Sequence, residues 1–318
     1  MKKDFLTFAE LSPQELQFVL GLSAKFKKRR KKMAPASHLR MRTLALLFQK
    51  QSTRTRLSFE VAIRELGGES VTLSMSELQL GRGETPEDTV AVLSRLVHGI
   101  IARVNSHEEL VRLASASSVP VINGLSDRFH PAQILADLLT LQERKKRLRG
   151  LKVAWVGDGN NVCNSWLYGA ALSGIDFVVA APRDYRPLEQ AVREAKSIGK
   201  STGGTITILE DPIEAVRDAD CVVTDTFVSM GFESDREKRL SVLMPKYTVS
   251  EELMSHAKRD AIFEHCMPAH RGEEVTSGVI DGPQSVVLDQ AENRLHTAKG
   301  LLCLVLLGKK AQAIARSL

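Results

Sequence analysis

The sequence predicts an α/β protein with two doubly wound domains, each built on a parallel sheet. Short runs of apolar and β-branched residues alternate with segments that carry helix-start signals. The alternation restarts near residue 150, after a basic segment at 143–150 that ends in glycine. Strand–helix alternation is the pattern of a parallel sheet covered on both faces. Two rounds of it therefore indicate two such domains, with the boundary in the basic segment.

The first round contains four predicted strands, at residues 43–48, 71–73, 99–104 and 119–122. Ser12 and Glu15 form a capping box with Pro13 at the first helical position, which predicts a helix before the first strand. A second helix is expected from about Thr53 to the glycine pair that begins at Gly67. Further helices are expected to begin at Thr85, at Ser106 (a second capping box, with Glu109) and, over residues 131–147, at Pro131.

The second round contains five predicted strands, at residues 152–156, 177–180, 205–209, 221–224 and 261–264. A helix is expected after the first of them, and a long helical stretch from about Glu292 ends the chain. With 318 residues, 43% of them hydrophobic, the chain is long enough for two domains that each bury a core.

Composition also limits the class of protein. No apolar run approaches the roughly 20 residues of a membrane span, and none follows the charged N-terminus, so we expect neither a membrane helix nor a secretory signal. The four cysteines lack C-x-x-C spacing, which argues against a zinc site or a disulfide frame and fits a reducing cytoplasm.

The net charge of +6 favours an anionic partner, either nucleic acid, a membrane surface or a small phosphate. Much of the excess lies in one basic run at residues 25–32. This run is either a nucleic-acid patch or the solvated end of a helix, where cations suit the negative end of the dipole. We favour the helix end, because no aromatic or helix-turn-helix pattern accompanies the run.

The most informative segment is Ser52-Thr53-Arg54-Thr55-Arg56, which follows a predicted strand and opens a helix. A helix N-terminus carries free N–H groups and a partial positive charge, so it attracts phosphate. The hydroxyls and the two arginines can add charge-assisted hydrogen bonds. The segment therefore indicates a phosphate site without a Walker lysine; the alternative is an N-cap followed by surface arginines.

Two further segments stand at predicted strand ends, where ligands bind in doubly wound sheets. His130 can donate to a carbonyl oxygen and Gln133 can accept from an amide, although this segment alone favours a helix start with an incidental histidine. Cys266 is either an inert core thiol or a reactive one, and this residue alone favours the inert reading.

A third segment, Gly157-Asp158-Gly159, resembles a dinucleotide-binding loop only loosely. The third glycine of that motif is missing, and Asn160 and Asn161 stand in its place. We therefore expect no nicotinamide cofactor.

Taken together, these segments resemble the aspartate/ornithine carbamoyltransferase family, and they are most like its ornithine-using members. They occur in the family's order and spread over nearly the whole chain. The matching segments lie at residues 48–56, 79–84, 130–133, 157–161, 225–231, 265–272 and 292–294. The resemblance implies a carbamoyl-phosphate-binding domain at 1–147, completed by a returning C-terminal helix at about 292–318, and an ornithine-binding domain at 148–291.

The resemblance also implies a reaction. The carbamoyl group of carbamoyl phosphate would pass to the side-chain amine of L-ornithine, giving L-citrulline and phosphate. No metal and no cofactor is implied. The family's assembly implies a homotrimer, or a multiple of trimers, with active sites at subunit interfaces. Neither nucleic acid nor a membrane is an implied partner.

Site residues follow from the matching positions. The carbamoyl-phosphate set is Ser52, Thr53, Arg54, Thr55, Gln79 from a neighbouring subunit, Arg103, His130, Gln133, Cys266, Met267 and Arg294. The ornithine set is Asn161, Asp225, Ser229 and Met230, and the catalytic set is Arg103, His130, Gln133, Asp225 and Cys266. Thr55, Arg103 and His130 would polarise the carbonyl group as an oxyanion hole does. Gln133 and the Cys266–Met267 backbone would hold the carbamoyl NH2.

The acceptor amine must attack as the free base, although its unperturbed pKa is near that of lysine, about 10.4. Cys266 and Asp225 are the nearby polar groups, and the departing phosphate can itself accept the proton. Residues 225–233 offer no cation for the second carboxylate of aspartate. Putrescine and N-acylornithine remain alternative acceptors, and a catalytically silent binding protein on the same scaffold is the alternative class.

Some positions depart from the common family pattern. Phenylalanine replaces tryptophan at 227 and glutamine at 232, methionine replaces leucine at 267, and glutamine replaces glutamate at 49. Phe227 and Phe232 flank the substrate loop. Of the properties that the resemblance implies, closure of this loop and affinity for the acceptor are therefore the least secure.

Overall fold

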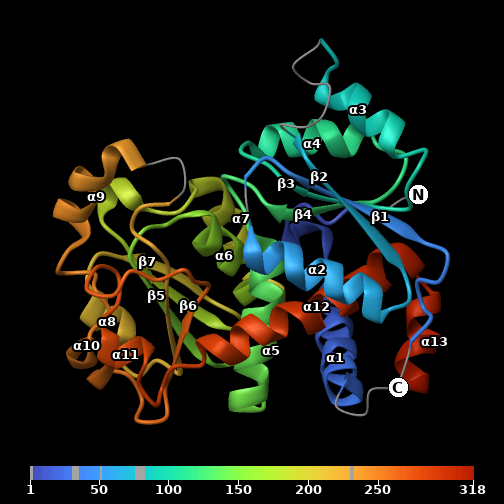
Figure 1. Cartoon of the computed structure of the whole chain (residues 1–318). Coiled ribbons are helices and arrows are strands. Elements are labelled where there is room, and N and C mark those ends of the chain that lie inside the picture. Colours follow the sequence, from blue (N-terminus) through green and yellow to red (C-terminus); the bar gives the residue numbers. More distant parts are fainter. Residues whose placement is uncertain (1–2, 31–35, 51, 76–82, 230–232) are drawn as a thin grey trace. The chain divides into compact units, whose positions relative to one another are not determined.

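The structure is a computed structural model that describes residues 3–30, 36–50, 52–75, 83–229 and 233–318. The chain divides into two compact units (Figure 1). Unit 1 comprises Met1–Leu139 and Glu292–Leu318, and unit 2 comprises Thr140–Ala291. In the described part of the chain, no helix is both long and apolar enough to cross a membrane.

Unit 1 contains a parallel four-stranded sheet in the order β2-β1-β3-β4. The strands are β1 (Thr43–Phe48), β2 (Glu69–Ser74), β3 (Ile100–Arg103) and β4 (Val121–Leu125). Helices α3 (Pro86–Leu93) and α4 (His107–Ala116) cover one face, and α2 (Thr53–Glu65) lies on the other (Figure 1). The chain runs from β1 to β2 on one side and then to β3 on the other, so its course across the sheet reverses between β1 and β3.

The N-terminal helix α1 (Pro13–Arg30) begins as predicted. Glu15 N–H donates to Ser12 Oγ at 3.2 Å, and Ser12 N–H donates to the Glu15 carboxylate at 2.9 Å, which confirms the capping box. At Ser106 the corresponding cap bond to Glu109 N–H is present at 3.3 Å, and the Glu109 carboxylate accepts from the Gln49 side chain at 2.7 Å.

The long C-terminal helix α12 (Val287–Leu307) packs against the N-terminal helices of unit 1, as predicted, although it begins before residue 292. Lys27 of α1 donates to Asn293 at 2.9 Å, and Glu65 of α2 pairs with Lys299. A Cβ atom on Gly300 would stand 2.3 Å from Ser23 Oγ, so only glycine allows this approach of α12 to α1. A last helix, α13 (Lys310–Ser317), follows.

The basic run at the end of α1 contacts the chain's own groups. Lys25 bonds to the Ala315 carbonyl, Lys27 to Asn293, and Arg30 pairs with Glu65 at 3.0 Å. Residues 31–32 of the run lie outside the described residues. These contacts are those of a helix end packed on α2, α12 and α13.

Unit 2 contains a parallel five-stranded sheet in the order β7-β6-β5-β8-β9. The strands are β5 (Lys152–Val156), β6 (Asp176–Ala180), β7 (Ile206–Leu209), β8 (Cys221–Thr224) and β9 (Ile262–His265). The course of the chain reverses between β5 and β8. With one such reversal in each sheet, the doubly wound α/β fold class predicted from the sequence is confirmed.

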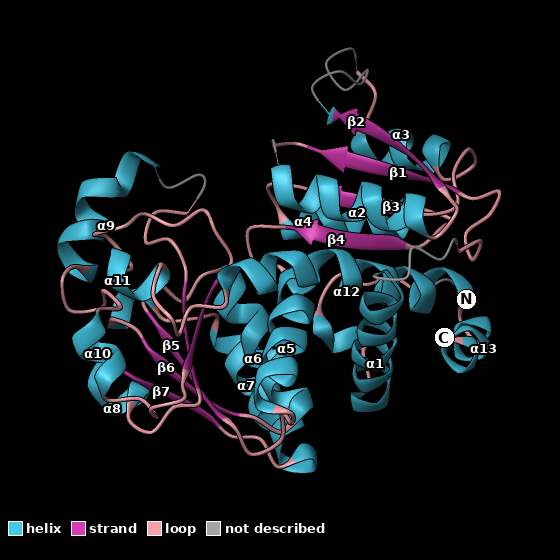
Figure 2. Cartoon of the chain, turned by 60° about the horizontal axis from the view of Figure 1, so that its bottom comes forward, coloured by secondary structure: helices cyan, strands magenta, loops and turns pink. Residues whose placement is uncertain are grey.

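The helices of unit 2 lie on both faces of its sheet (Figure 2). α6 (Asn161–Ser173) and α7 (Glu189–Thr202) cover one face. The short helices α8 (Pro212–Val216), α9 (Arg236–Leu243), α10 (Glu251–Ser255) and α11 (Ser277–Ile280) contribute side chains to the core on the other face. Helix α5 (Pro131–Lys145) carries the chain from unit 1 into unit 2 and ends where Lys146 adopts a positive φ of 65°.

Candidate active site

In unit 1, the reversal between β1 and β3 brings two predicted phosphate ligands together. Ser52 follows β1 and caps α2, and Arg103 is the last residue of β3. Arg103, only 8% exposed, donates from Nη1 to Ser52 Oγ at 3.1 Å. The backbone N–H of Gln49 donates to the Arg103 carbonyl at 2.9 Å, and this bond joins the ends of β1 and β3. The ends of both strands therefore face the start of α2.

The start of α2 is available to an anion. The Ser52 side chain makes no capping hydrogen bond, and the first turn of any α-helix leaves its N–H groups without partners inside the helix. Thr53 is exposed there and Arg54 is half-buried. Arg56, in contrast, is exposed and pairs with Glu60 of the same helix at 2.9 Å. In this structure Arg56 is therefore engaged with its own helix, and its contact with phosphate stays a prediction.

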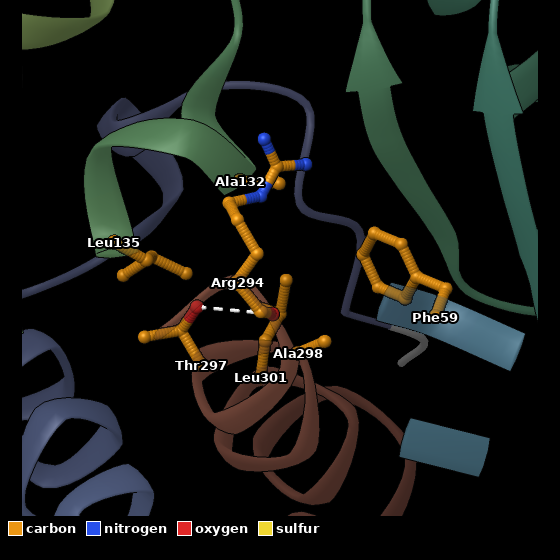
Figure 3. A pocket seen from close by; sticks show the side chains of 7 residues that line it. All are labelled: Phe59, Ala132, Leu135, Arg294, Thr297, Ala298 and Leu301. Carbon is orange, nitrogen blue, oxygen red and sulfur yellow. Dashed lines mark hydrogen bonds between the residues drawn. The ribbon is translucent and has the colours of Figure 1, made fainter. Parts of the chain in front are cut away.

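A third arginine reaches the same place from α12. Arg294 Nη2 donates to Thr55 Oγ1 at 3.1 Å, and Arg294 Nη1 donates to Gln133 Oε1. Nη1 also lies 3.4 Å from His130 Nε2. The aliphatic part of Arg294 runs through a small pocket lined by Phe59, Ala132, Leu135, Thr297, Ala298 and Leu301 (Figure 3). Arg294 therefore joins α2 and α5 at one buried point.

His130 is a neutral imidazole in this surrounding. It is buried at the entrance to α5, where Ser126 Oγ accepts from Phe129 N–H at 3.3 Å and fixes the preceding loop. Burial lowers its pKa well below 6.5, and the positive charges of Arg294, Arg103 and Arg54 lower it further. A neutral histidine can donate one N–H to a carbonyl oxygen while its other nitrogen accepts.

In unit 2, the reversal between β5 and β8 also gathers polar side chains. Asp225 follows β8, and its carboxylate accepts from Asn160 Nδ2 at 2.7 Å and from Cys266 Sγ at 3.0 Å. Asn160 caps α6 by accepting from Val162 N–H at 2.9 Å. Asn161, the first residue of α6, and Ser229, on the loop after Asp225, are both half-buried. The predicted ornithine ligands Asn161 and Asp225 thus lie at the ends of adjacent strands.

A buried ion pair anchors the loop that follows Asp225. Arg239 of α9 pairs with Asp158 and donates from Nε to the Phe227 carbonyl at 2.7 Å. Burial raises the pKa of Asp158 to about 6, and the nearby Asp225 also raises it, while Arg239 opposes both. The Asp158–Arg239 pair thus holds the loop against the end of β5.

Phe227 is part of the unit 2 core. Its side chain is fully buried, and its ring lies 2.9 Å from where a Cβ atom of Gly157 would stand. Gly157 also has a φ of 119°, so this position requires glycine twice over. Phe227 thus flanks the loop as a buried anchor, with its ring packed into the core of unit 2.

The Cys266–Met267 backbone is held by a buried histidine. His265 Nδ1 accepts from Met267 N–H at 2.8 Å, so the ring proton lies on Nε2, which donates to the Glu274 carboxylate at 3.2 Å. Met267 adopts a φ of 55°, a conformation that is unfavourable for a residue with a side chain. The histidine thereby helps to keep the backbone of Met267 in this unusual form.

Two clusters of the described residues have metal-ligand chemistry, namely Asp225, His265 and Cys266, and His270, Glu273 and Glu274. In the first, both ring nitrogens of His265 are engaged, which leaves only two ligands. In the second, Glu273 pairs with Arg236, which already balances its charge. Neither arrangement resembles a closed metal site.

Gln79, Met230 and Phe232 lie outside the described residues, so their predicted roles are not tested. Sequence reasoning did not assign roles to four residues that support the site. These residues are Asp137, Asn160, Arg239 and Glu274. Asn160 stood in the quoted 157–161 segment, and its N-cap chemistry was a usable signal. The other three are single charged residues whose burial depends on the tertiary fold.

Two doubly wound units, each with buried charged side chains at its strand reversal, place the chain in the class of two-domain α/β proteins whose ligands bind at strand ends. The chain belongs to the aspartate/ornithine carbamoyltransferase family. Residues 3–143 match its carbamoyl-P binding domain, and residues 149–305 match its Asp/Orn binding domain.

Individual relatives agree over their full length. The chain is 49% identical to the ornithine carbamoyltransferase of Methanoculleus marisnigri over 98% of this chain and 99% of that protein. It is 51% identical to that of Carboxydothermus hydrogenoformans over 96% and 97% of the two chains. It also superimposes on the solved ornithine carbamoyltransferase of Pyrococcus furiosus with a TM-score of 0.93 and 48% identity, over 96% and 98% of the two chains.

Proposed function

We propose that this protein is an ornithine carbamoyltransferase, which converts carbamoyl phosphate and L-ornithine into L-citrulline and phosphate. The observation that carries the proposal is the buried cluster of Arg103, Arg294, Thr55, His130 and Gln133 beside the start of α2. The full-length similarity to ornithine carbamoyltransferases supports the choice of reaction.

In this proposal, carbamoyl phosphate binds unit 1 through its phosphate. The amides and hydroxyls of Ser52, Thr53 and Thr55 donate to the phosphate oxygens, and Arg54 and Arg103 balance the charge. Residues 1–147, with 292–318, would form this binding domain. Gln79 of a neighbouring subunit would complete it, so a homotrimer or a multiple of trimers is part of the proposal.

The carbonyl group then lies among donors. Thr55, Arg103 and His130 direct hydrogen bonds at the carbonyl oxygen, and these bonds strengthen as the tetrahedral intermediate gains negative charge. Arg294 completes the anion site. Gln133 Oε1, together with the backbone at Cys266 and Met267, accepts from the carbamoyl NH2. The neutral state of His130 suits this role, because the ring must donate without bringing a further buried charge among three guanidiniums.

L-Ornithine binds unit 2, which we assign to residues 148–291. Asp225 and Asn161 bind the ammonium and carboxylate of the amino acid, and Ser229 and Met230 contribute from the loop. The side-chain amine attacks the carbonyl carbon, the C–O bond to phosphate breaks, and the amine proton passes to phosphate or to a nearby polar group such as Cys266 or Asp225. No metal, cofactor or covalent enzyme intermediate is required, and a cytoplasmic location stays a prediction.

The test is an acceptor panel with the purified protein. Ornithine, N-acetylornithine, putrescine and aspartate are each supplied with carbamoyl phosphate, and carbamoylated product is measured. Citrulline formed from ornithine, with a kcat/KM at least about tenfold above that for every other amine, supports the proposal. A preference for another amine, or no product from a folded oligomer, contradicts it.

A further inference from the structure

A buried carboxylate lies behind the carbamoyl-binding residues. Asp137 is fully buried in α5, one helical turn after Gln133. Gln133 Nε2 donates to Asp137 Oδ1 at 2.8 Å. Residues 129–141 of this segment are all buried, so the carboxylate is kept from water on every side. A charge in such a place is costly unless it is hydrogen-bonded, which makes its partner informative.

The two ends of the Gln133 amide are held by groups that allow only one orientation. A guanidinium can only donate and an ionised carboxylate can only accept. Arg294 therefore requires Oε1, and the bond on the other side has Nε2 donating to Asp137 Oδ1. Because Oε1 has a second lone pair, it remains able to accept from a ligand while Arg294 occupies the first.

Orientation of this amide decides which acyl phosphate fits. With Oε1 forward, the site offers an acceptor, which the NH2 of a carbamoyl group satisfies and the CH3 of an acetyl group does not. With the amide reversed, the site would offer a donor to a donor. The choice between carbamoyl and acyl phosphates therefore depends on what holds Gln133.

We propose that Asp137 is a positioning residue that fixes the Gln133 amide and thereby makes unit 1 selective for carbamoyl phosphate over acyl phosphates. This inference rests on the proposed function and deepens it. Arg294 supplies the second constraint, and its stem is packed against Phe59, Leu135 and Leu301 (Figure 3). The selectivity thus originates in Asp137, which acts through its hydrogen bond to the Gln133 amide.

The test measures binding without ornithine. Isothermal titration of the full-length protein gives the Kd of carbamoyl phosphate, acetyl phosphate and inorganic phosphate. The informative quantity is the Kd ratio of acetyl to carbamoyl phosphate. In Asp137→Leu, which has similar size and no acceptor, this ratio should fall about tenfold while phosphate binding is kept. Asp137→Asn, which retains an acceptor oxygen, should restore most of the ratio.

Several results would overturn the proposal. These are an unchanged ratio in Asp137→Leu, an equal weakening of all three ligands, and an Asp137→Asn variant that behaves like Asp137→Leu. If Asp137→Leu does not fold, Asp137→Ser, whose hydroxyl is too short to replace the contact, gives the same reading. In a Gln133→Ala background, the Asp137 change should leave the ratio untouched. A wild-type protein that does not bind carbamoyl phosphate would reject the proposed function itself, whereas selective wild-type binding with unaffected variants rejects only this inference.

Discussion

The two sheets reverse their course at equivalent places and carry opposite charges there. Between β1 and β3 of unit 1, Arg103 and Arg294 are buried beside His130. Between β5 and β8 of unit 2, Asp158 and Asp225 are buried, and Arg239 pairs with Asp158. The same architecture therefore brings strand ends together in the same way, and the side chains at those ends decide which charge gathers there.

The titrating groups report this difference. Burial lowers the pKa of His130, and the surrounding arginines of unit 1 lower it further, which marks this site as a positively charged environment. Burial and the neighbouring Asp225 raise the pKa of Asp158. A phosphate thus suits the first site, and an ammonium group suits the second. Each prediction below removes one side of this contrast.

The largest effect is expected from unit 1. Arg103→Ala should lower kcat/KM by about a hundredfold or more, because it removes charge-assisted hydrogen bonds worth on the order of 1.5–3 kcal/mol each. Arg54→Ala should act in the same direction. Steady-state kinetics with ornithine measures the loss. Arg56→Ala is the matched control, since Arg56 pairs with Glu60 on the exposed face of α2. A loss of kcat/KM in Arg56→Ala as large as that in Arg54→Ala would contradict the assignment of the phosphate site.

A smaller and more selective effect is expected from unit 2. Asp225→Asn keeps the shape and removes the charge, so the KM for ornithine should rise roughly ten- to a hundredfold. Inorganic phosphate should bind this variant as it binds the wild type, which calorimetry can check. The exposed Asp184→Asn is the control. An equal loss of phosphate binding would mean that the two charge environments are not independent.

The Asp158–Arg239 pair should give unit 2 a pH dependence. Below about pH 6, Asp158 takes up a proton, its hold on Arg239 weakens, and kcat/KM for ornithine should fall a few-fold. Asp158→Asn should show the low value at every pH and no inflection near 6. For stability the sign is opposite, because the folded protein binds the proton more tightly. The free energy of unfolding should therefore fall as pH rises from about 4 to about 6.

The smallest effect concerns the stability of unit 1. His130 stays neutral when folded, whereas the unfolded chain takes up its proton below a pKa of about 6.5. The free energy of unfolding should therefore rise with pH until about 6.5 and gain nothing from this group above it. His130→Gln should reduce this rise in the free energy of unfolding by on the order of 1 kcal/mol. Urea unfolding at pH 5.5 and 7.5 measures it, and an unchanged slope would rule out His130 as its source.

The same contrast between regions shows what could be predicted from sequence. β1, β5 and β8 have their predicted bounds, because each is a buried apolar run with clear turn signals on both sides. The short helices α8 and α10, with five residues each, have too few turns to show a period and were not predicted. β4 begins at Val121 instead of residue 119, after Pro120, which has no N–H for the ladder.

For the site, sequence patterns identified the hydroxyls and arginines at the start of α2, because helix N-termini have known chemistry. They could not identify Asp137, since an acid one turn after a glutamine on a helix normally faces water. They also could not identify Arg239, because it stands in a run of charged residues that a local pattern assigns to a solvated surface. In both cases burial results from packing by distant segments, which a local pattern does not contain.

The returning helix α12 has a consequence for how the protein is made. Arg294 lies in the last tenth of the chain, yet it bonds to Thr55 and Gln133 in the first half. During synthesis on the ribosome, the first sheet can therefore form long before its anion site is complete. Nascent chains that end before residue 294 lack both the third guanidinium and the closing segment of unit 1, so the ability to hold a phosphate should appear late, as the carboxyl-terminal segment emerges.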